Sequence, residues 1–424
     1  MHARAETLLL LVAISLLSVL PWHTLASGGG GGKPLVAAVT KDGSTSLYTV
    51  AVKDGRPLAL DLSGLLVWST CDASHSTVMP YERECIEANR YTPPSCWMQH
   101  GAGAGAGSDY RYGNKCTARP YNSLTGKCAP GDLTRTSLAA DATNGSNPLY
   151  QVSFPAVAAC APESLLASLP AGAVGVAGLG RSELALHAQI AATQNVAKKF
   201  ALCLPSVAVF GGGPFVLIFP YWRPDITARL SYTALRRSPE LGAGGYYITA
   251  KGITVNHQVH QQLALPNHGP LVVQLSSTIP YTELRPDVYG PFIKAWDSIT
   301  EWPKKVTPPV APFELCYDSR TLSSNRLGYA VPEIDINLED GATWHIFGGN
   351  SLVQVDDSTA CFAFVEMKPE KVGYGNDAPA VVIGGYQMEH NLVVFDEEKQ
   401  QLGFSGLLFG LQTTCNNFNF TVAA

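Results

Sequence analysis

Apolar and polar residues alternate in short blocks along this chain, and the same order of blocks occurs twice. Residues 58–64 and 271–277 are apolar runs that each enter a polar loop. A later apolar run ends in glycine in each half, at residues 173–178 and 381–385. The loop-to-glycine separation is roughly 110–120 residues both times, as a duplicated structural unit would give. The pattern predicts two related halves, each with a strand that leads into a polar loop.

Helical periodicity is confined to short segments. Residues 183–197 carry apolar side chains at helical spacing, with Ser182 as an N-cap, and residues 288–299 predict a second helix. Residues 332–344 alternate between apolar and polar, which favours strands on either side of a turn at residues 339–341. Because Val-, Thr- and Tyr-containing runs punctuated by glycine dominate elsewhere, the sequence predicts an all-β protein.

Chain length indicates two lobes. The chain has 424 residues, too many for one typical core, and it suits two lobes of roughly 180 residues each. Residues 209–214 end an apolar run in three glycines and a proline and mark the junction. We expect an N-terminal lobe over residues 34–215 and a C-terminal lobe over residues 216–424. The net charge of −5 and the pI of about 6.1 give no basis for binding nucleic acid or an anionic membrane.

Residues 1–26 are typical of an export signal. Arg4 precedes an apolar run at residues 8–20, and small residues stand at the usual positions before a cut after Ala26. The apolar run is too short to span a bilayer comfortably, although a signal anchor is the alternative. Residues 27–33 then form a Gly-rich leader. We expect a protein secreted to the extracellular space or cell wall, with no membrane segment.

The cysteines fit an oxidising compartment, where an even number indicates disulfides, here five. The ten cysteines are Cys71, Cys85, Cys96, Cys116, Cys128, Cys160, Cys203, Cys316, Cys361 and Cys415. Cys316 and Cys361 are alone in the body of the second half and are expected to pair. The sequence leaves open whether Cys203 and Cys415 join the lobe boundary to the C-terminal tail, and it does not fix the other pairs. A metal site is the rival interpretation, but no CxxC or His-rich spacing supports it.

Candidate modification and metal sites are few. Asn144 and Asn419 begin N-x-S/T sequences, so each is a candidate glycosylation site. The nearest approach to a histidine cluster is His257, His260 and His268, on a polar stretch where a metal site is not expected. We expect neither a metal nor a cofactor.

Short motifs in both halves carry a family resemblance. They lie at residues 66–71, 121–128 and 210–214 in the first half, and at 275–281, 313–318, 361–367 and 383–389 in the second. On these motifs the chain resembles the pepsin-like aspartic proteases, and within them the plant branch of TAXI-type xylanase inhibitors, extracellular dermal glycoproteins and basic 7S globulins. The resemblance implies a bilobal all-β fold with a central cleft, and Tyr121 on or near a hairpin that covers the cleft. The chain has fewer cysteines than this branch commonly carries.

The resemblance also implies a catalytic site that has lost one acid. In active relatives two aspartates share one proton and activate a water between them. Asp61 and Gln274 occupy the two matching positions, and in both loops leucine replaces the small hydroxyl residue and serine replaces the glycine. A glutamine amide cannot take up or give a proton near neutral pH, so no aspartic-protease activity is expected. Asp61 is then a lone general acid or base or, as we favour, a leftover hydrogen-bonded carboxylate. Neither Asp287 nor Asp297 is expected to replace the missing acid.

A protease-like body without its chemistry points to a function in binding. The resemblance implies a monomeric plant defence protein that binds a microbial glycoside hydrolase. Inhibitors of the TAXI type present a histidine from a C-terminal segment to the catalytic carboxylates of the target. Here Phe409 falls at or near that position, beside Leu408, and both are candidate target-contacting residues. Because phenylalanine cannot pair with an acid, this substitution counts against xylanases as the target.

Two other functions stay open. Residues 333–340 are rich in acids, and a wall-directed glycan hydrolase such as a chitinase needs paired carboxylates. We interpret this run instead as the solvated edge of a strand. The third hypothesis is an extracellular receptor-like or storage protein that binds a glycan or peptide. Whether the chain is an enzyme of another kind is therefore left undecided.

Overall fold

The computed structural model describes residues 31–72, 74–90, 96, 114–218, 225–237, 244–256, 269–372 and 378–420. The predicted export signal, the start of the Gly-rich leader and the three clustered histidines lie outside these ranges. No helix within them is long and apolar enough to cross a membrane.

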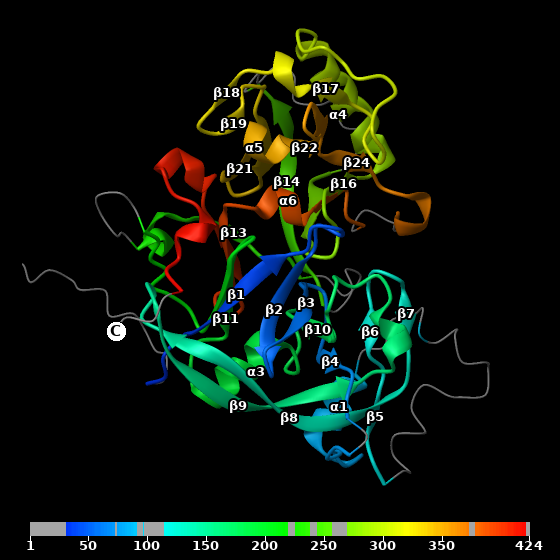
Figure 1. The fold of residues 1–424 in the computed structure, drawn as a ribbon, viewed down its shortest axis with the longest axis vertical. Coiled ribbons are helices and arrows are strands. Elements are labelled where there is room, and N and C mark those ends of the chain that lie inside the picture. The colour runs from blue at the N-terminus through cyan, green and yellow to red at the C-terminus, as the bar shows by residue number, and fades with distance from the viewer. Residues whose placement is uncertain are drawn as a thin grey trace, which may run out of the picture.

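The fold consists of two β-rich lobes, as the sequence predicted (Figure 1). The largest sheet has thirteen strands in the order β13-β27-β26-β11-β12-β1-β2-β3-β10-β4-β9-β8-β5. These strands are β1 (Leu35–Lys41), β2 (Tyr48–Lys53), β3 (Arg56–Asp61), β4 (Val67–Ser69), β5 (Thr117–Ala118), β8 (Gly131–Thr143), β9 (Pro148–Cys160), β10 (Gly175–Gly178), β11 (Lys199–Cys203), β12 (Val207–Phe210), β13 (Ser231–Ala234), β26 (Leu392–Asp396) and β27 (Gln401–Phe404). Because β13, β26 and β27 come from beyond residue 215, strands of both predicted lobes share this sheet.

The second lobe is built on a seven-stranded sheet in the order β21-β20-β14-β15-β25-β16-β24. Its strands are β14 (Tyr246–Val255), β15 (Leu271–Leu275), β16 (Thr282–Leu284), β20 (Ile334–Leu338), β21 (Thr343–Ile346), β24 (Phe364–Glu366) and β25 (Val381–Ile383). Smaller sheets pair β17 (Cys316–Asp318), β23 (Thr359–Phe362) and β22 (Leu352–Asp356), then β18 (Ser324–Asn325) with β19 (Gly328–Tyr329), and β6 (Tyr121–Asn122) with β7 (Lys127–Cys128).

The predicted duplication is confirmed by two matching parallel pairs. β3 runs parallel to β10 in the first lobe, and β15 runs parallel to β25 in the second. In each pair the first strand is the apolar run that enters the polar loop, and the second is the run that ends in glycine. A polar loop therefore leaves an equivalent point of each lobe.

The helices are short, and two of them match the predicted segments 183–197 and 288–299. They are α1 (Arg83–Ala88), α3 (Leu186–Gln194), α4 (Pro286–Ile299), α5 (Gly348–Ser351) and α6 (Gly385–Met388), with 3-10 turns η2 (Glu163–Leu166), η3 (Ile226–Arg229), η5 (Ser319–Thr321), η6 (Pro369–Lys371), η7 (Leu408–Leu411) and η8 (Cys415–Asn417). The predicted N-cap, Ser182, lies before α3: its hydroxyl accepts a bond from Leu184 N–H at 3.1 Å in a preceding turn, and Ala185 is the N-cap. α4 begins at Pro286 because proline suits the first helical position.

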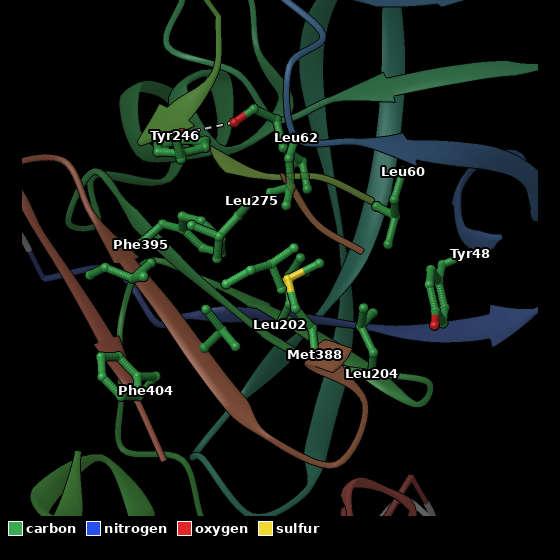
Figure 2. Close-up of a cluster of buried hydrophobic side chains, with 14 of the residues drawn as sticks. Tyr48, Leu60, Leu62, Leu202, Leu204, Tyr246, Leu275, Met388, Phe395 and Phe404 are labelled. Atoms are coloured by element: carbon green, nitrogen blue, oxygen red, sulfur yellow. Dashed lines mark hydrogen bonds between the residues drawn. The ribbon is translucent and has the colours of Figure 1, made fainter. Parts of the chain in front are cut away.

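The two lobes share one apolar core. Figure 2 shows side chains from both halves, among them Leu60, Leu62, Leu275, Met388 and Phe395, in a single buried cluster. Each of these five is at most 1% exposed. Removing so much apolar surface from water favours a fixed arrangement of the lobes.

A buried polar network also crosses between the lobes. Glu397, which follows β26, has a side chain only 8% exposed, and its Oε1 lies 3.1 Å from His187 Nε2 and 2.7 Å from Tyr246 Oη. Lys198 Nζ lies 3.3 Å from Glu397 Oε2. Burial alone would raise the pKa of Glu397, but the bonds from His187 and Tyr246 and the charge of Lys198 outweigh it and lower that pKa to about 2.

Five disulfides use all ten cysteines, as predicted from their even number. The bonds are Cys71–Cys160, Cys85–Cys116, Cys96–Cys128, Cys203–Cys415 and Cys316–Cys361. The expected pairing of Cys316 with Cys361 is confirmed. The open question about Cys203 is also resolved, because its bond joins the end of β11 to the C-terminal tail.

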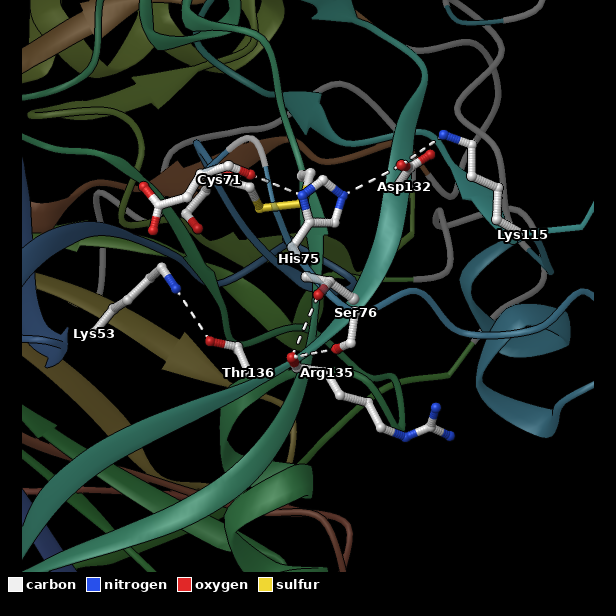
Figure 3. Close-up of a disulfide and its surroundings, with 12 residues drawn as sticks. Lys53, Cys71, His75, Ser76, Lys115, Asp132, Arg135 and Thr136 are labelled. Carbon is white, nitrogen blue, oxygen red and sulfur yellow. Dashed lines mark hydrogen bonds and ion pairs between the residues drawn. A yellow bond between two sulfur atoms is a disulfide. The ribbon is translucent and has the colours of Figure 1, made fainter.

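Beside the first disulfide, polar contacts join the loop after β4 to β8. Figure 3 shows His75 next to Cys71, with its Nε2 3.2 Å from Asp132 Oδ2. Lys115 Nζ lies 2.8 Å from the same carboxylate oxygen. These groups are partly exposed, so we assign them a role in holding the loop in place.

The acid-rich run at residues 333–340 is not the solvated strand edge that we expected. β20 lies between β21 and β14 inside the sheet. Asp335 is 4% exposed, and its Oδ1 lies 2.7 Å from Nδ1 of His345 on β21. Within the run, Glu339 and Asp340, in the turn after β20, are exposed. Apolar alternation predicted the strand, but sheet order decides which strands lie at an edge.

Candidate functional site

Asp61 stands at the point where β3 meets β10. Its backbone is paired with Gly178, and its side chain is 3% exposed. Oδ1 accepts a hydrogen bond from Ser63 N–H at 2.8 Å, and Oδ2 accepts one from Ser123 Oγ at 2.8 Å. Burial raises the pKa of Asp61 above its ordinary value, although these hydrogen bonds oppose the shift. Each carboxylate oxygen thus already has a protein donor.

The donor Ser123 belongs to the hairpin of β6 and β7, which covers Asp61. Tyr121 lies on β6 and is half-buried; its carbonyl accepts a bond from Trp68 Nε1 at 3.1 Å. Asn122 is fully buried and donates to the carbonyls of Leu165 and Ala167 at 2.8 and 2.9 Å. The hairpin is therefore fastened on both sides of the serine, which holds its hydroxyl against the acid.

In the second loop, hydrogen bonding matches Ser276 to Asp61, two residues after the predicted Gln274. Ser276 directly follows β15, and its N–H bonds to Ile383 O of β25 at 2.9 Å. Its Oγ accepts from the N–H two residues later, Thr278, at 3.2 Å, as Asp61 accepts from Ser63. Gln274 instead lies within β15, paired with Tyr247.

The two loops are joined by Ser277. Its Oγ accepts from Leu62 N–H at 3.0 Å and donates to Leu60 O at 2.8 Å. The two bonded residues, Leu60 and Leu62, stand on either side of Asp61 in the chain. Asp61 therefore matches the residue before Ser277, which is Ser276. Leu62 has no hydroxyl and cannot make the equivalent bonds to the second loop. The hydroxyl bonds between the two loops therefore come from Ser277. Three consecutive hydroxyl residues, Ser276, Ser277 and Thr278, follow the apolar run. They were the sequence signal that could have pointed to Ser276 as the residue that matches Asp61.

The arrangement supplies one carboxylate and one hydroxyl where a protease needs two carboxylates. A serine hydroxyl does not ionise at acidic pH, so it cannot share a proton with Asp61 as a second aspartate would. Asp287 bonds to Arg285 Nε at 2.6 Å, and Asp297 to Lys305 Nζ at 2.6 Å. These ion pairs hold both alternative acids in α4.

The two candidate contact residues near the C-terminus differ in exposure. Leu408 is fully buried in the cluster around the Cys203–Cys415 disulfide, so it cannot contact a partner in this structure. Phe409 is half-exposed, with its ring centroid 4.6 Å from that of His390. Only Phe409 of this pair is open to a target.

The two glycosylation candidates lie at the surface. Asn144 is exposed in the turn between β8 and β9, and Asn419 is half-exposed near the C-terminus. The third residue of the Asn419 sequence, Thr421, lies outside the described residues.

One group of possible metal ligands was not predicted. Within the described ranges, ligand atoms of Glu333, Asp335 and His345 lie within 4.8 Å of one another. The hydrogen bond that His345 donates to Asp335 raises the pKa of His345, because it favours the charged imidazole. The Asp335–His345 ion pair accounts for two of the three groups, so we assign no metal to them.

A bilobal β fold of this kind with a degenerate dyad defines an aspartic-protease-like protein. Residues 48–214 match the family described as "Xylanase inhibitor N-terminal", and residues 245–406 match "Xylanase inhibitor C-terminal". The chain belongs to this family, the TAXI-type branch of pepsin-like proteins.

Individual relatives support this assignment. "Chitinase CLP" from Oryza sativa subsp. japonica is 57% identical, over 97% of this chain and 98% of that protein. "Probable aspartic proteinase GIP2" from Nicotiana benthamiana is 33% identical, over 92% and 93%.

Solved structures agree with the fold. The structure named edgp gives a TM-score of 0.76 at 31% identity, over 92% of this chain and 98% of that one. Basic 7S globulin from soybean gives 0.71 at 26%, over 92% and 100%. An aspartic proteinase from Irpex lacteus, at 11% identity and a TM-score of 0.54, shares the fold alone.

Proposed function

We propose that this protein is a secreted, non-proteolytic defence protein that acts by binding a microbial glycoside hydrolase. The observation that carries the proposal is that the loop of Ser276, which matches that of Asp61, supplies a hydroxyl in place of a second carboxylate, together with the bond from Ser123 to Asp61. Secretion is supported by the N-terminal apolar run and by five disulfides, which persist in oxidising compartments. Binding of a hydrolase is supported by membership of the xylanase-inhibitor family.

The first test is proteolysis at acidic pH. We expect the purified protein to cleave a denatured protein substrate at least about a thousandfold more slowly than an active two-aspartate relative. Asp61→Asn should leave this background unchanged. Ser276→Asp alone should not restore activity, because Ser123 still occupies Oδ2 of Asp61. Cleavage that a statine-type inhibitor blocks and that Asp61→Asn abolishes would show that the dyad reasoning is wrong.

The second test is inhibition of hydrolases. Phe409 is an aromatic side chain on a turn held by the Cys203–Cys415 disulfide, and such rigid aromatics often anchor interfaces. We expect the protein to inhibit a member of a panel of fungal and bacterial xylanases and chitinases, and Phe409→Ala to weaken inhibition by about tenfold or more. Tyr81→Ala, at a tyrosine that is 77% exposed on the other lobe, is the control and should change nothing. Absence of inhibition across the panel at micromolar protein argues against this function.

A second candidate function is hydrolysis of a wall glycan. It is favoured by the relative at 57% identity that is named a chitinase. Glu333 and Asp335 lie near each other and are a pair of acids of the kind that such chemistry needs. Release of soluble sugar from chitin by the pure protein, lost in Glu333→Gln, would favour this function over inhibition.

A further inference from the structure

A pocket of about 390 Å³ opens on the second lobe, away from Asp61. Five segments that are distant in sequence form it: the residue after β14, the end of α4 with the residues that follow it, the β18–β19 hairpin, the entry to β20 and the exit from β21. Three aromatic side chains line it, Trp302, Tyr329 and Phe347. Its volume lies within the usual range for small-molecule sites.

Trp302 is the unusual member of this set. It is 56% exposed, although tryptophan is among the most buried residue types on average. It lies just beyond α4, whose own tryptophan, Trp296, is fully buried. The core of α4 is thus complete without Trp302, whose ring faces solvent at the pocket. An exposed ring beside two half-buried rings provides flat apolar surface that a ligand can cover.

The polar groups of the pocket are two amides and one carboxylate: Asn256, Asn325 and Glu333. Asn325 Oδ1 accepts from Leu327 N–H at 2.7 Å, which orients its amide. Glu333 lies in the cluster with Asp335 and His345 on the adjoining strands. None of the pocket-lining residues is a lysine or arginine, so the site does not suit a phosphate or other anion.

We propose that this pocket binds a neutral oligosaccharide. The apolar C–H faces of sugar rings stack on aromatic rings, and their hydroxyls bond to amide and carboxylate groups. A purely apolar ligand would displace water from the polar groups of Asn256, Asn325 and Glu333 without offering them hydrogen bonds, which is costly. The pocket is separate from the surface at Phe409. Leu327, which lines the pocket, lies between the two, since its Cδ2 would stand 3.5 Å from a Cβ placed on Gly410, the residue after Phe409. The proposal therefore goes beyond hydrolase binding and does not depend on it.

Titration calorimetry with chitotetraose and with xylotetraose tests the site. We expect at least one of the two to bind the wild-type protein, Trp302→Ala to weaken binding by about tenfold or more, and Glu333→Gln to weaken it several-fold. Tyr150→Ala, at a tyrosine 57% exposed on β9, is the matched control and should bind as the wild type does. Because the Trp302 side chain is exposed, its removal should leave the thermal midpoint nearly unchanged.

Two outcomes overturn the proposal: no binding of either sugar by the wild type at roughly millimolar concentration, or unchanged binding in both Trp302→Ala and Glu333→Gln. Phe409→Ala separates this proposal from the inhibitor function, since it should leave sugar binding intact. Failure of hydrolase inhibition with retained, Trp302-dependent sugar binding would remove only the inhibitor function.

Discussion

Replacing both Cys203 and Cys415 with alanine is expected to lower the free energy of unfolding by about 5 kcal/mol. The disulfide closes a loop with a sequence separation of 212, which is long and therefore restricts the unfolded chain strongly. It also fixes the C-terminal tail, with Leu408 and Phe418, against β11. Urea denaturation, followed by tryptophan fluorescence, measures the change.

The matched control removes Cys85 and Cys116, whose separation is only 31. The same loop-entropy relation gives about 4 kcal/mol there, so the C-terminal bond should cost more by about 1 to 2 kcal/mol. An equal or smaller loss for the Cys203–Cys415 pair would contradict the expectation. Loss of the longer bond should also weaken any function that depends on Phe409, because the turn that carries it lies in the same buried cluster.

Glu397→Gln is expected to destabilise the protein by about 3 kcal/mol near neutral pH, and progressively less in acid. The pKa of Glu397 falls from an ordinary 4.5 to about 2 in the folded protein, and each unit of such a shift corresponds to about 1.4 kcal/mol. A carboxylate with a lowered folded pKa contributes stability that is complete above its unfolded pKa. That contribution is therefore present above about pH 4.5 and is lost as the pH falls toward 2.

Denaturation curves of the wild type and Glu397→Gln at several pH values test this. The difference between them should shrink between pH 4.5 and pH 2, the interval bounded by the two pKa values. Glu398→Gln is the control, because its side chain is exposed and lies outside the contact with His187. A pH-independent difference, or an equal effect in the control, would rule out the network as the cause.

Local sequence patterns predicted the fold well where burial of a strand directly requires the apolar pattern. Apolar runs that end in polar loops or in glycine became β3, β10, β15 and β25, since a strand buried on both faces must be apolar throughout. Helix ends were less accurate. Ser182 is a residue type that often caps helices, yet its hydroxyl accepts a bond within the turn that precedes α3. The surrounding structure, and not the residue type alone, determines where the helix begins.

The candidate site shows where such patterns stop being informative. Asp61 is the hydrogen-bonded carboxylate that we expected, whereas hydrogen bonding matches it to Ser276, two residues after the predicted Gln274. The triplet Gln274-Leu275-Ser276 repeats the leucine and serine of Asp61-Leu62-Ser63, so local sequence favoured Gln274 over Ser276. The cross-lobe bonds of Ser277 fix the alignment, and they join residues more than two hundred positions apart.

The sequence by itself determined that this is an all-β protein of two related halves with one surviving acid, because strand patterns, cysteine number and residue identity are local properties. Only the tertiary structure decided that Ser276 takes the matching place in the second loop, that Ser123 bonds to the acid, and that Leu408 is buried while Phe409 is partly exposed. It also brought Trp302 beside Tyr329 and Glu333. Those outcomes depend on strand order and on contacts between distant segments, which packing of the whole chain determines.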